Sequence, residues 1–204
     1  MRGTSERAET TYLRWSARAA SPAARRLGFA WGFAEATLFF IVPDVLLGAI
    51  ALFAHRSAAR VLAVTLAGAL LGGAVTYAVA ASVRPARTEA VMDAVPTIRT
   101  SAIRRVERET RDDGPRSVLY GPVRTGTPYK LYARAAGVQD ESLGAFLLWS
   151  VPGRLERMLP ITLLAALAGL FGRRWIARQP QLTLALYACA WTAVYIVYVL
   201  RVGV

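Results

Sequence analysis

The segment WGFAEATLFFIVPDVLLG, residues 31–48, is apolar enough to lie at membrane depth, yet three of its residues suit hydrocarbon poorly: Glu35, Pro43 and Asp44. A carboxylate in the bilayer core costs roughly 2.5–3.5 kcal/mol on insertion scales. Pro43 lacks a backbone N–H and breaks a helix, so the carbonyl groups that it frees need protein or water beside them. We therefore expect a broken helix that faces a polar cavity, with both acids inside that cavity.

The whole chain has the composition of a membrane protein. Its 204 residues are 55% hydrophobic, with a mean hydropathy of +0.37, and a soluble domain of this size is rarely so apolar. The sequence predicts an all-α integral membrane protein, with a basic arm over residues 1–26 and a single membrane domain over residues 27–204. Four apolar blocks are long enough to cross a bilayer: residues 27–54, 61–83, 143–171 and 182–200.

The net charge of +12 comes almost entirely from arginine, since Lys130 is the only lysine among the 25 basic residues. Basic stretches alternate with apolar blocks, which is typical of cytoplasmic loops and of contacts with anionic headgroups. No pattern of a nucleic-acid-binding module occurs, so we expect no nucleic-acid partner. Residues 1–26 hold six arginines and no apolar core. They do not resemble a signal peptide, and we expect the N-terminus to lie in the cytoplasm.

Histidine and cysteine each occur once, as His55 and Cys189. This excludes a disulfide framework and a metal site built from cysteines. A metal site would need carboxylates, and these are scattered along the chain. We therefore predict neither a metal ion nor another cofactor.

Residues 27–54 allow two arrangements. A single kinked span would place the following loop, residues 55–60, outside the cell. A re-entrant hairpin with Pro43 at its tip would return this loop to the cytoplasm. Its arms, about 21 and 15 Å long at helical rise, are each too short to cross the bilayer. The hairpin keeps the basic loops inside with fewer crossings, so we favour it.

The next two segments differ in polarity. Residues 61–83 form an apolar span, in which the sequence GALLG, residues 68–72, has the spacing that lets two helix backbones approach closely. We expect these glycines to pack against the first broken helix, and Tyr77 to line the cavity. Residues 84–117 are polar. Their part IRRVERETRDD, residues 103–113, predicts an exposed surface helix, and we expect a scaffolding role.

Residues 118–137, VLYGPVRTGTPYKLYARAAG, are too polar for one span and too short for two. The sequences Gly-Pro and Gly-Thr-Pro indicate turns within this segment. We therefore expect a second broken element with Gly126 and Pro128 at its tip. Lys130 and Arg134 would be costly against lipid, and we expect them to face the cavity. The first element would then supply acids and the second would supply bases.

Arg154 and Arg157 lie three residues apart in the span of residues 143–171, on one face of a helix. Two arginines beside hydrocarbon can bind the oxygens of a phosphate group. They can also pair with Glu35 and Asp44 inside the protein. The sequence leaves both roles open, and the two roles are compatible because a phosphate can compete for the same arginines.

The order of segments is repeated once along the chain. A broken hairpin followed by a span occurs at residues 27–54 and 61–83, and again at residues 118–137 and 143–171. The two units would enter the membrane from opposite faces, as inverted repeats do in transporters, where paired interrupted segments indicate the substrate site. A last span, residues 182–200, completes the domain. It carries an aromatic stripe, which we define as Tyr187, Trp191, Tyr195 and Tyr198. Aromatic residues at this helical spacing are more typical of packing or of an interface belt than of a binding site.

Four pieces of the chain, in this order and spacing, resemble the DedA/VTT superfamily, also called SNARE-associated membrane proteins. They are the early acid with its Pro-Asp pair, the span GALLGGAVTY, the hairpin GTPYKLYARAAG and the stretch SVPGRLERMLP, and together they cover roughly residues 30–165. The resemblance implies two re-entrant hairpins that face each other and a role in moving or scrambling lipids. It also implies a bacterial inner membrane protein acting on polyprenyl phosphates or phospholipids, sometimes with proton coupling.

Together, these observations predict a flippase for a phosphate-bearing lipid and not an enzyme. Its substrate and proton site would consist of Glu35, Asp44, Arg154 and Arg157, and its partners would be lipids with anionic headgroups. Assembly into a homo-oligomer is left open. Two alternatives remain. One is a membrane enzyme acting on lipid phosphates, which would need a nucleophile or a metal-bound water. The other is a scaffold whose buried charges are only structural.

Overall fold

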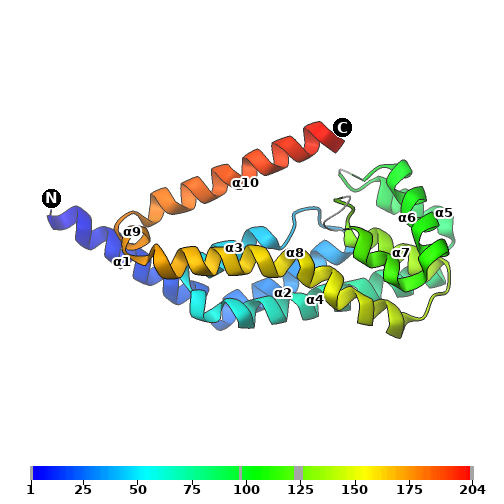
Figure 1. Ribbon diagram of the computed structural model, residues 1–204, viewed down its shortest axis with the longest axis horizontal. Helices are drawn as coiled ribbons and strands as arrows, with labels where there is room; N and C mark the ends of the chain where they lie inside the picture. The colour runs from blue at the N-terminus through cyan, green and yellow to red at the C-terminus, as the bar shows by residue number, and fades with distance from the viewer. Residues whose placement is uncertain (1, 97, 122–125, 203–204) are drawn as a thin grey trace.

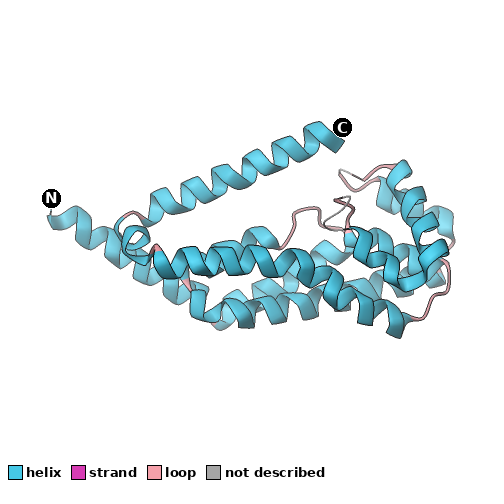
Figure 2. Cartoon of the chain, in the orientation of Figure 1, coloured by secondary structure: helices cyan, strands magenta, loops and turns pink. Residues whose placement is uncertain are grey.

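The computed structural model describes residues 2–96, 98–121 and 126–202, and the regular elements in these ranges are all helices (Figure 1, Figure 2). The all-α prediction is thus confirmed for the described residues. Two helical stretches are long and apolar enough to span a membrane, His55–Ser82 and Pro180–Leu200. In chain order the elements are α1 (Arg2–Ala19), α2 (Pro22–Thr37), α3 (Asp44–Phe53), η1 (His55–Ser57), α4 (Ala58–Ser82), α5 (Pro85–Asp93), α6 (Thr100–Asp113), η2 (Gly114–Tyr120), α7 (Tyr129–Val138), α8 (Leu143–Phe171), α9 (Arg173–Arg178) and α10 (Pro180–Val202).

Helices α2 and α4 lie side by side and run in the same direction (Figure 1). Gly68 of α4 lies against the backbone of Phe29, and Gly72 lies one turn further on against the backbone of Phe33. A Cβ atom at either glycine would overlap with that backbone, so this approach requires the smallest side chain. The prediction that these glycines pack against the first broken helix is confirmed.

Between α2 and α4 the chain turns back on itself. Helix α2 ends at Thr37, residues 38–43 form a loop, and α3 runs in the opposite direction along the molecule (Figure 1). The end of α3 lies beside α1, where the Ser16 hydroxyl donates a hydrogen bond to the carbonyl oxygen of Phe53. Helix α2 begins at Pro22, directly after α1. The broken segment therefore starts and finishes at the same end of the molecule.

The second broken segment starts from the other end of the molecule. Helix η2 leads inward, and α7 leads back outward along α4, with Tyr129 against Gly73 and Gly137 against the backbone of Tyr77. Residues 122–125, between η2 and α7, lie outside the described residues. The chain then turns and returns along the whole molecule as α8 (Figure 1).

Helix α8 is continuous although it contains Pro152 and Pro160. Prolines inside a helix usually interrupt it, and this helix continues through both. A proline removes one backbone hydrogen bond and is tolerated where neighbouring elements hold the helix in place. In α8 this support includes Met158, which is fully buried in a cluster with Leu47 of α3. The hydroxyl of Ser142 caps the first turn by accepting a hydrogen bond from the backbone N–H of Ala145.

The polar segment forms α5 and α6, which cover the end of the molecule where α7 lies. Helix α6 buries Ile103 in the core and turns a charged face toward α7. Glu107 there forms an ion pair of 2.6 Å with Arg134, and Glu109 accepts a hydrogen bond of 2.7 Å from the hydroxyl of Tyr132. These contacts hold the second broken segment, which agrees with the scaffolding role expected for residues 84–117.

At the opposite end, α1 packs its Tyr12 and Trp15 rings against Phe53 of α3. Helix α10 extends from this end along the outside of the bundle (Figure 1). Only 6% of the most apolar 18-residue stretch of α10 is buried within the molecule. Most of this long apolar surface therefore has no covering element in the described chain.

Candidate functional site

Glu35 and Arg154 form a buried ion pair in the middle of the bundle. Glu35 lies in the last turns of α2 and Arg154 in α8, and both side chains are almost fully buried. The guanidinium donates two hydrogen bonds to the carboxylate, from Nη2 to Oε2 at 2.6 Å and from Nη1 to Oε1 at 3.4 Å. This two-point geometry is the strong form of the arginine–carboxylate contact.

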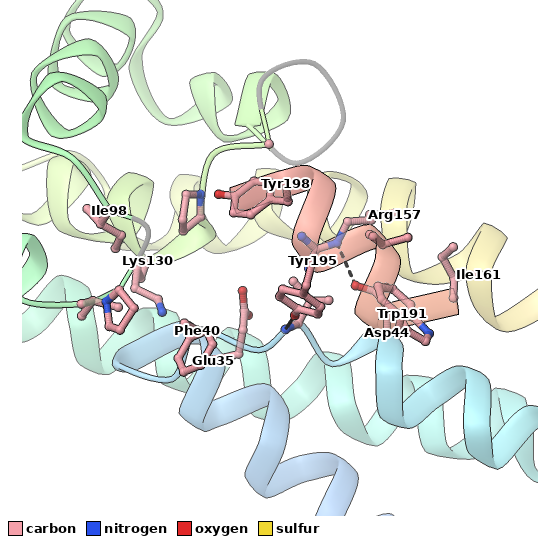
Figure 3. Close-up of a pocket in the computed structure, with 16 residues that line it drawn as sticks. Glu35, Phe40, Asp44, Ile98, Lys130, Arg157, Ile161, Trp191, Tyr195 and Tyr198 are labelled. Atoms are coloured by element: carbon pink, nitrogen blue, oxygen red, sulfur yellow. Dashed lines mark hydrogen bonds and ion pairs between the residues drawn. The ribbon is translucent and has the colours of Figure 1, made fainter. Parts of the chain in front are cut away.

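Asp44 and Arg157 form a second pair, one helical turn along α8 from the first. Arg157 Nε lies 2.9 Å from Asp44 Oδ2 (Figure 3). Asp44 is buried, whereas the side chain of Arg157 is 24% exposed. The pair is close but poorly aligned, because neither oxygen of Asp44, nor Nε or Nη2 of Arg157, makes a hydrogen bond within the described chain. Nε and Nη2 of Arg157 are thus buried without a hydrogen-bond partner in the described chain, beside a side chain that is partly exposed.

The turn between α2 and α3 brings the two acids to one site. Glu35 precedes the loop and Asp44 follows it at the first turn of α3, where the positive end of the helix favours a carboxylate. Arg154 and Arg157 are three residues apart on α8 and so share a face. The structure thus brings together all four residues that the sequence predicts as a substrate site.

Lys130 joins this site from the second broken segment. Its Nζ donates a hydrogen bond of 2.6 Å to the carbonyl oxygen of Phe39, in the loop between α2 and α3. This loop is the stretch where Pro43 prevents a regular helix, so its carbonyl groups need external donors. Figure 3 shows Lys130 and Glu35 facing the same space. With the two arginines and two acids, the site holds three cations against two carboxylates.

A cavity of about 330 Å³ lies beside four of these five charged residues, Glu35, Asp44, Lys130 and Arg157. Gly126 and Pro128, the described part of the predicted second tip, are among its lining residues. Gly126 has a φ angle of +66°, a conformation that favours glycine. Pro43 of the first tip is buried at the start of α3, next to the cavity-lining Asp44. The cavity is therefore built from both broken segments.

Helix α10 supplies the outer wall of the cavity, which the sequence did not predict. Trp191, Tyr195 and Tyr198 line it (Figure 3). The backbone N–H of Val42 donates a hydrogen bond of 2.9 Å to the hydroxyl of Tyr195. These three aromatic residues therefore face the charged cavity, and Tyr195 also holds the loop between α2 and α3. Aromatic residues at helical spacing are equally typical of packing, so the sequence alone could not assign this position.

Two predicted cavity residues lie elsewhere. Tyr77 donates a hydrogen bond to the carbonyl oxygen of Glu141 and stacks on Phe146, toward the far end of α4. Arg134 is fully buried and pairs with Glu107 of α6. The prediction that these two residues line the charged cavity is wrong, because each finds a polar partner at the end of the molecule where α7 and α8 meet.

Tyr129 is a further residue at the site that the sequence did not indicate. Its ring lies under the guanidinium of Arg154, 4.8 Å from carbon to ring centre, and its hydroxyl donates to Ser150 at 3.0 Å. A cation over an aromatic face is stabilised by the ring electrons, most strongly when both are desolvated. Arg154 is thus held by the ring of Tyr129 as well as by the carboxylate of Glu35.

The site has the chemistry of an anion-binding pocket beside apolar surface. Excess positive charge, arginine N–H groups without a hydrogen-bond partner and aromatic walls are features that suit an anionic group on an apolar body. No group of three potential metal-binding residues is found within residues 2–96, 98–121 and 126–202. No known protein-family model matches the chain, and neither a characterised protein nor a solved structure shows significant similarity to it.

Proposed function

We propose that this protein is an integral membrane transporter or flippase for a phosphate-bearing lipid. The two broken segments would be re-entrant hairpins that enter the bilayer from opposite faces, and α4, α8 and α10 would cross it. The N-terminal arm would lie in the cytoplasm. If the resemblance to the DedA/VTT superfamily holds, the protein would lie in a bacterial inner membrane, and its substrate would be a polyprenyl phosphate or a phospholipid.

The observation that carries this proposal is the pair of acid–arginine contacts at the place where the two broken segments meet. Glu35 pairs with Arg154, and Asp44 pairs with Arg157 beside a cavity. Ionisable residues at membrane depth are costly, and they usually mark a substrate or ion pathway. Interrupted helices in two repeated units are also typical of transporter sites.

The geometry supports a specific order of events at the site. Arg157 is the more accessible arginine, its pairing with Asp44 is poorly aligned, and it would receive the phosphate first. The phosphate oxygens would replace the carboxylate of Asp44, which would then take up a proton or move toward Lys130. Arg154 would stay with Glu35 until the two units rock against each other and expose the other face.

Reconstitution tests this proposal. The purified full-length protein is placed in liposomes that contain a fluorescent phosphatidylglycerol or a labelled polyprenyl phosphate, and a membrane-impermeant quencher reports how much label reaches the outer leaflet. We expect protein-dependent movement of at least one of these lipids. No movement of either lipid above that in empty liposomes would contradict the proposal. Release of inorganic phosphate from the lipid would instead indicate an enzyme.

The close pairing of Glu35 and Arg154 favours a second candidate, a membrane scaffold without a substrate. Both side chains are buried, and they satisfy each other in two hydrogen bonds. In a scaffold only the pairing matters, so exchanging the two residue types would preserve function. In a transporter the position of the cation matters as well, and the exchanged protein would fold but would not move lipid.

A further inference from the structure

A second hollow lies directly beside the charged cavity. It is an open groove of about 630 Å³ between α10 and the first broken segment. Phe40, Trp191 and Tyr195 line both the groove and the charged cavity, so the two spaces share a wall. Its lining residues come from residues 40–45 and from residues 188–200 of α10.

The groove differs from the cavity in its chemistry. None of its lining residues is charged, and aliphatic and aromatic side chains form most of its surface. The hydroxyl of Tyr195 already accepts a hydrogen bond from Val42, so its ring is the part offered to an occupant. Thr192 is the only other hydroxyl among the lining residues. An occupant with unpaired backbone N–H and C=O groups would find few partners here, which disfavours an extended peptide.

We infer that this groove holds one hydrocarbon chain of the lipid whose anionic headgroup lies in the charged cavity near Arg157 and Lys130. The inference rests on the proposed function and adds a chain-binding subsite to it. The shared wall of Phe40, Trp191 and Tyr195 lies where the polar and apolar parts of such a lipid would join. Tyr and Trp suit this boundary because each combines an apolar ring with a polar tip.

The position of α10 supports this occupant. Its most apolar stretch is almost uncovered, and the hydroxyls of Tyr187 and Tyr195 connect it to the first broken segment. Tyr187 anchors the stripe by donating a hydrogen bond of 2.7 Å to the carbonyl oxygen of Val45. A hydrocarbon chain between α10 and the loop would bury apolar surface on both sides. Recognition would therefore depend on the chain as well as on the headgroup.

Photolabelling of the purified full-length protein in neutral detergent tests the inference. The probe is phosphatidylglycerol with a diazirine in one acyl chain, and mass spectrometry locates the labelled residues. Ala188→Trp places a large ring in the groove, whereas Ala190→Trp places the same ring on a different face of α10, outside the lining residues. Thr192→Phe is a second groove-filling variant in case Ala188→Trp does not fold.

We expect labelling of residues 40–45 and 188–199 in the unchanged protein, and about a tenfold loss of this labelling when the groove is filled. Ala190→Trp should label like the unchanged protein. Equal labelling in the groove-filled and control variants would overturn the inference. Cross-linking of α10 to a second copy of the chain through the groove residues would also overturn it, because a partner helix would then be the occupant.

The failure of this inference can be told apart from the failure of the proposed function. If groove-filled variants lose no labelling and the unchanged protein still moves lipid in liposomes, the subsite is wrong and the transporter remains. If the groove is labelled as expected but no lipid moves, the subsite remains and the transporter is wrong. Glycerol phosphate, which has the headgroup chemistry without a chain, should bind equally to Ala188→Trp and to the unchanged protein.

Discussion

Lys130 of α7 donates a hydrogen bond of 2.6 Å to the carbonyl oxygen of Phe39, in the loop that follows α2. Ninety-one residues separate the two in sequence. Through this contact the second broken segment satisfies a backbone group that the break in the first leaves without a helical partner. The chain thus uses its only lysine to join the two units beside the charged cavity.

Lys130→Met tests the contribution of this contact. Methionine keeps much of the volume and loses the charge and the donor, so the carbonyl group of Phe39 loses its partner. We expect a destabilisation of about 1–3 kcal/mol, measured by thermal unfolding in detergent. Lipid movement in liposomes should fall by at least about tenfold. Unchanged lipid movement would show that this contact is structural only.

Arg154→Ala should destabilise the protein strongly. It leaves Glu35 buried without its partner and removes the cation that lies over Tyr129. Breaking a buried ion pair in this way costs about 3–5 kcal/mol. The exchanged variant, Glu35→Arg with Arg154→Glu, should recover much of the thermal stability. Recovery of lipid movement as well would show that this pair serves transport only through its pairing, and would contradict a role for the position of its cation.

Gly68→Val should separate α2 from α4. The new side chain would overlap with the backbone of Phe29, and overpacking of this kind typically costs about 1–3 kcal/mol. Ala67→Val is the matched control, because Ala67 is exposed on the same helix. We expect a lower unfolding temperature for Gly68→Val alone. Equal unfolding temperatures in the two variants would contradict the close approach of these helices.

The proposed topology predicts which residues are accessible from each side of the membrane. In a Cys189→Ser background, Thr10→Cys and Arg56→Cys should react with an impermeant thiol reagent from the cytoplasmic side. Ser101→Cys, at the opposite end of the molecule, should react from outside. Reaction of Arg56→Cys from outside would mean that residues 27–54 cross the bilayer once, which would contradict the re-entrant arrangement.

The sequence predicted the four central residues because charges in an apolar segment are rare and costly. Glu35, Asp44, Arg154 and Arg157 were recognisable for this reason. The glycines of residues 68–72 were recognisable as well, because their spacing on one helix face is a local pattern.

The remaining features depend on contacts between distant segments. The partner of Arg134 is Glu107, on a helix whose docking against α7 no local pattern specifies. The outer wall of the cavity, with Trp191 and Tyr195, has the same spacing as ordinary packing residues. The direction of α3 is likewise fixed by its contacts with α1 and α8, so the sequence alone allowed two arrangements for residues 27–54.

The most direct test of the central claim compares two neighbouring charges on α8. Arg157 lines the charged cavity, whereas Glu156 is exposed and is not among its lining residues. Movement of fluorescent phosphatidylglycerol in liposomes is measured for the unchanged protein, Arg157→Gln and Glu156→Gln. We predict that Arg157→Gln abolishes movement while Glu156→Gln retains it, with both variants folded. Full movement by folded Arg157→Gln would contradict the claim that this arginine binds the headgroup.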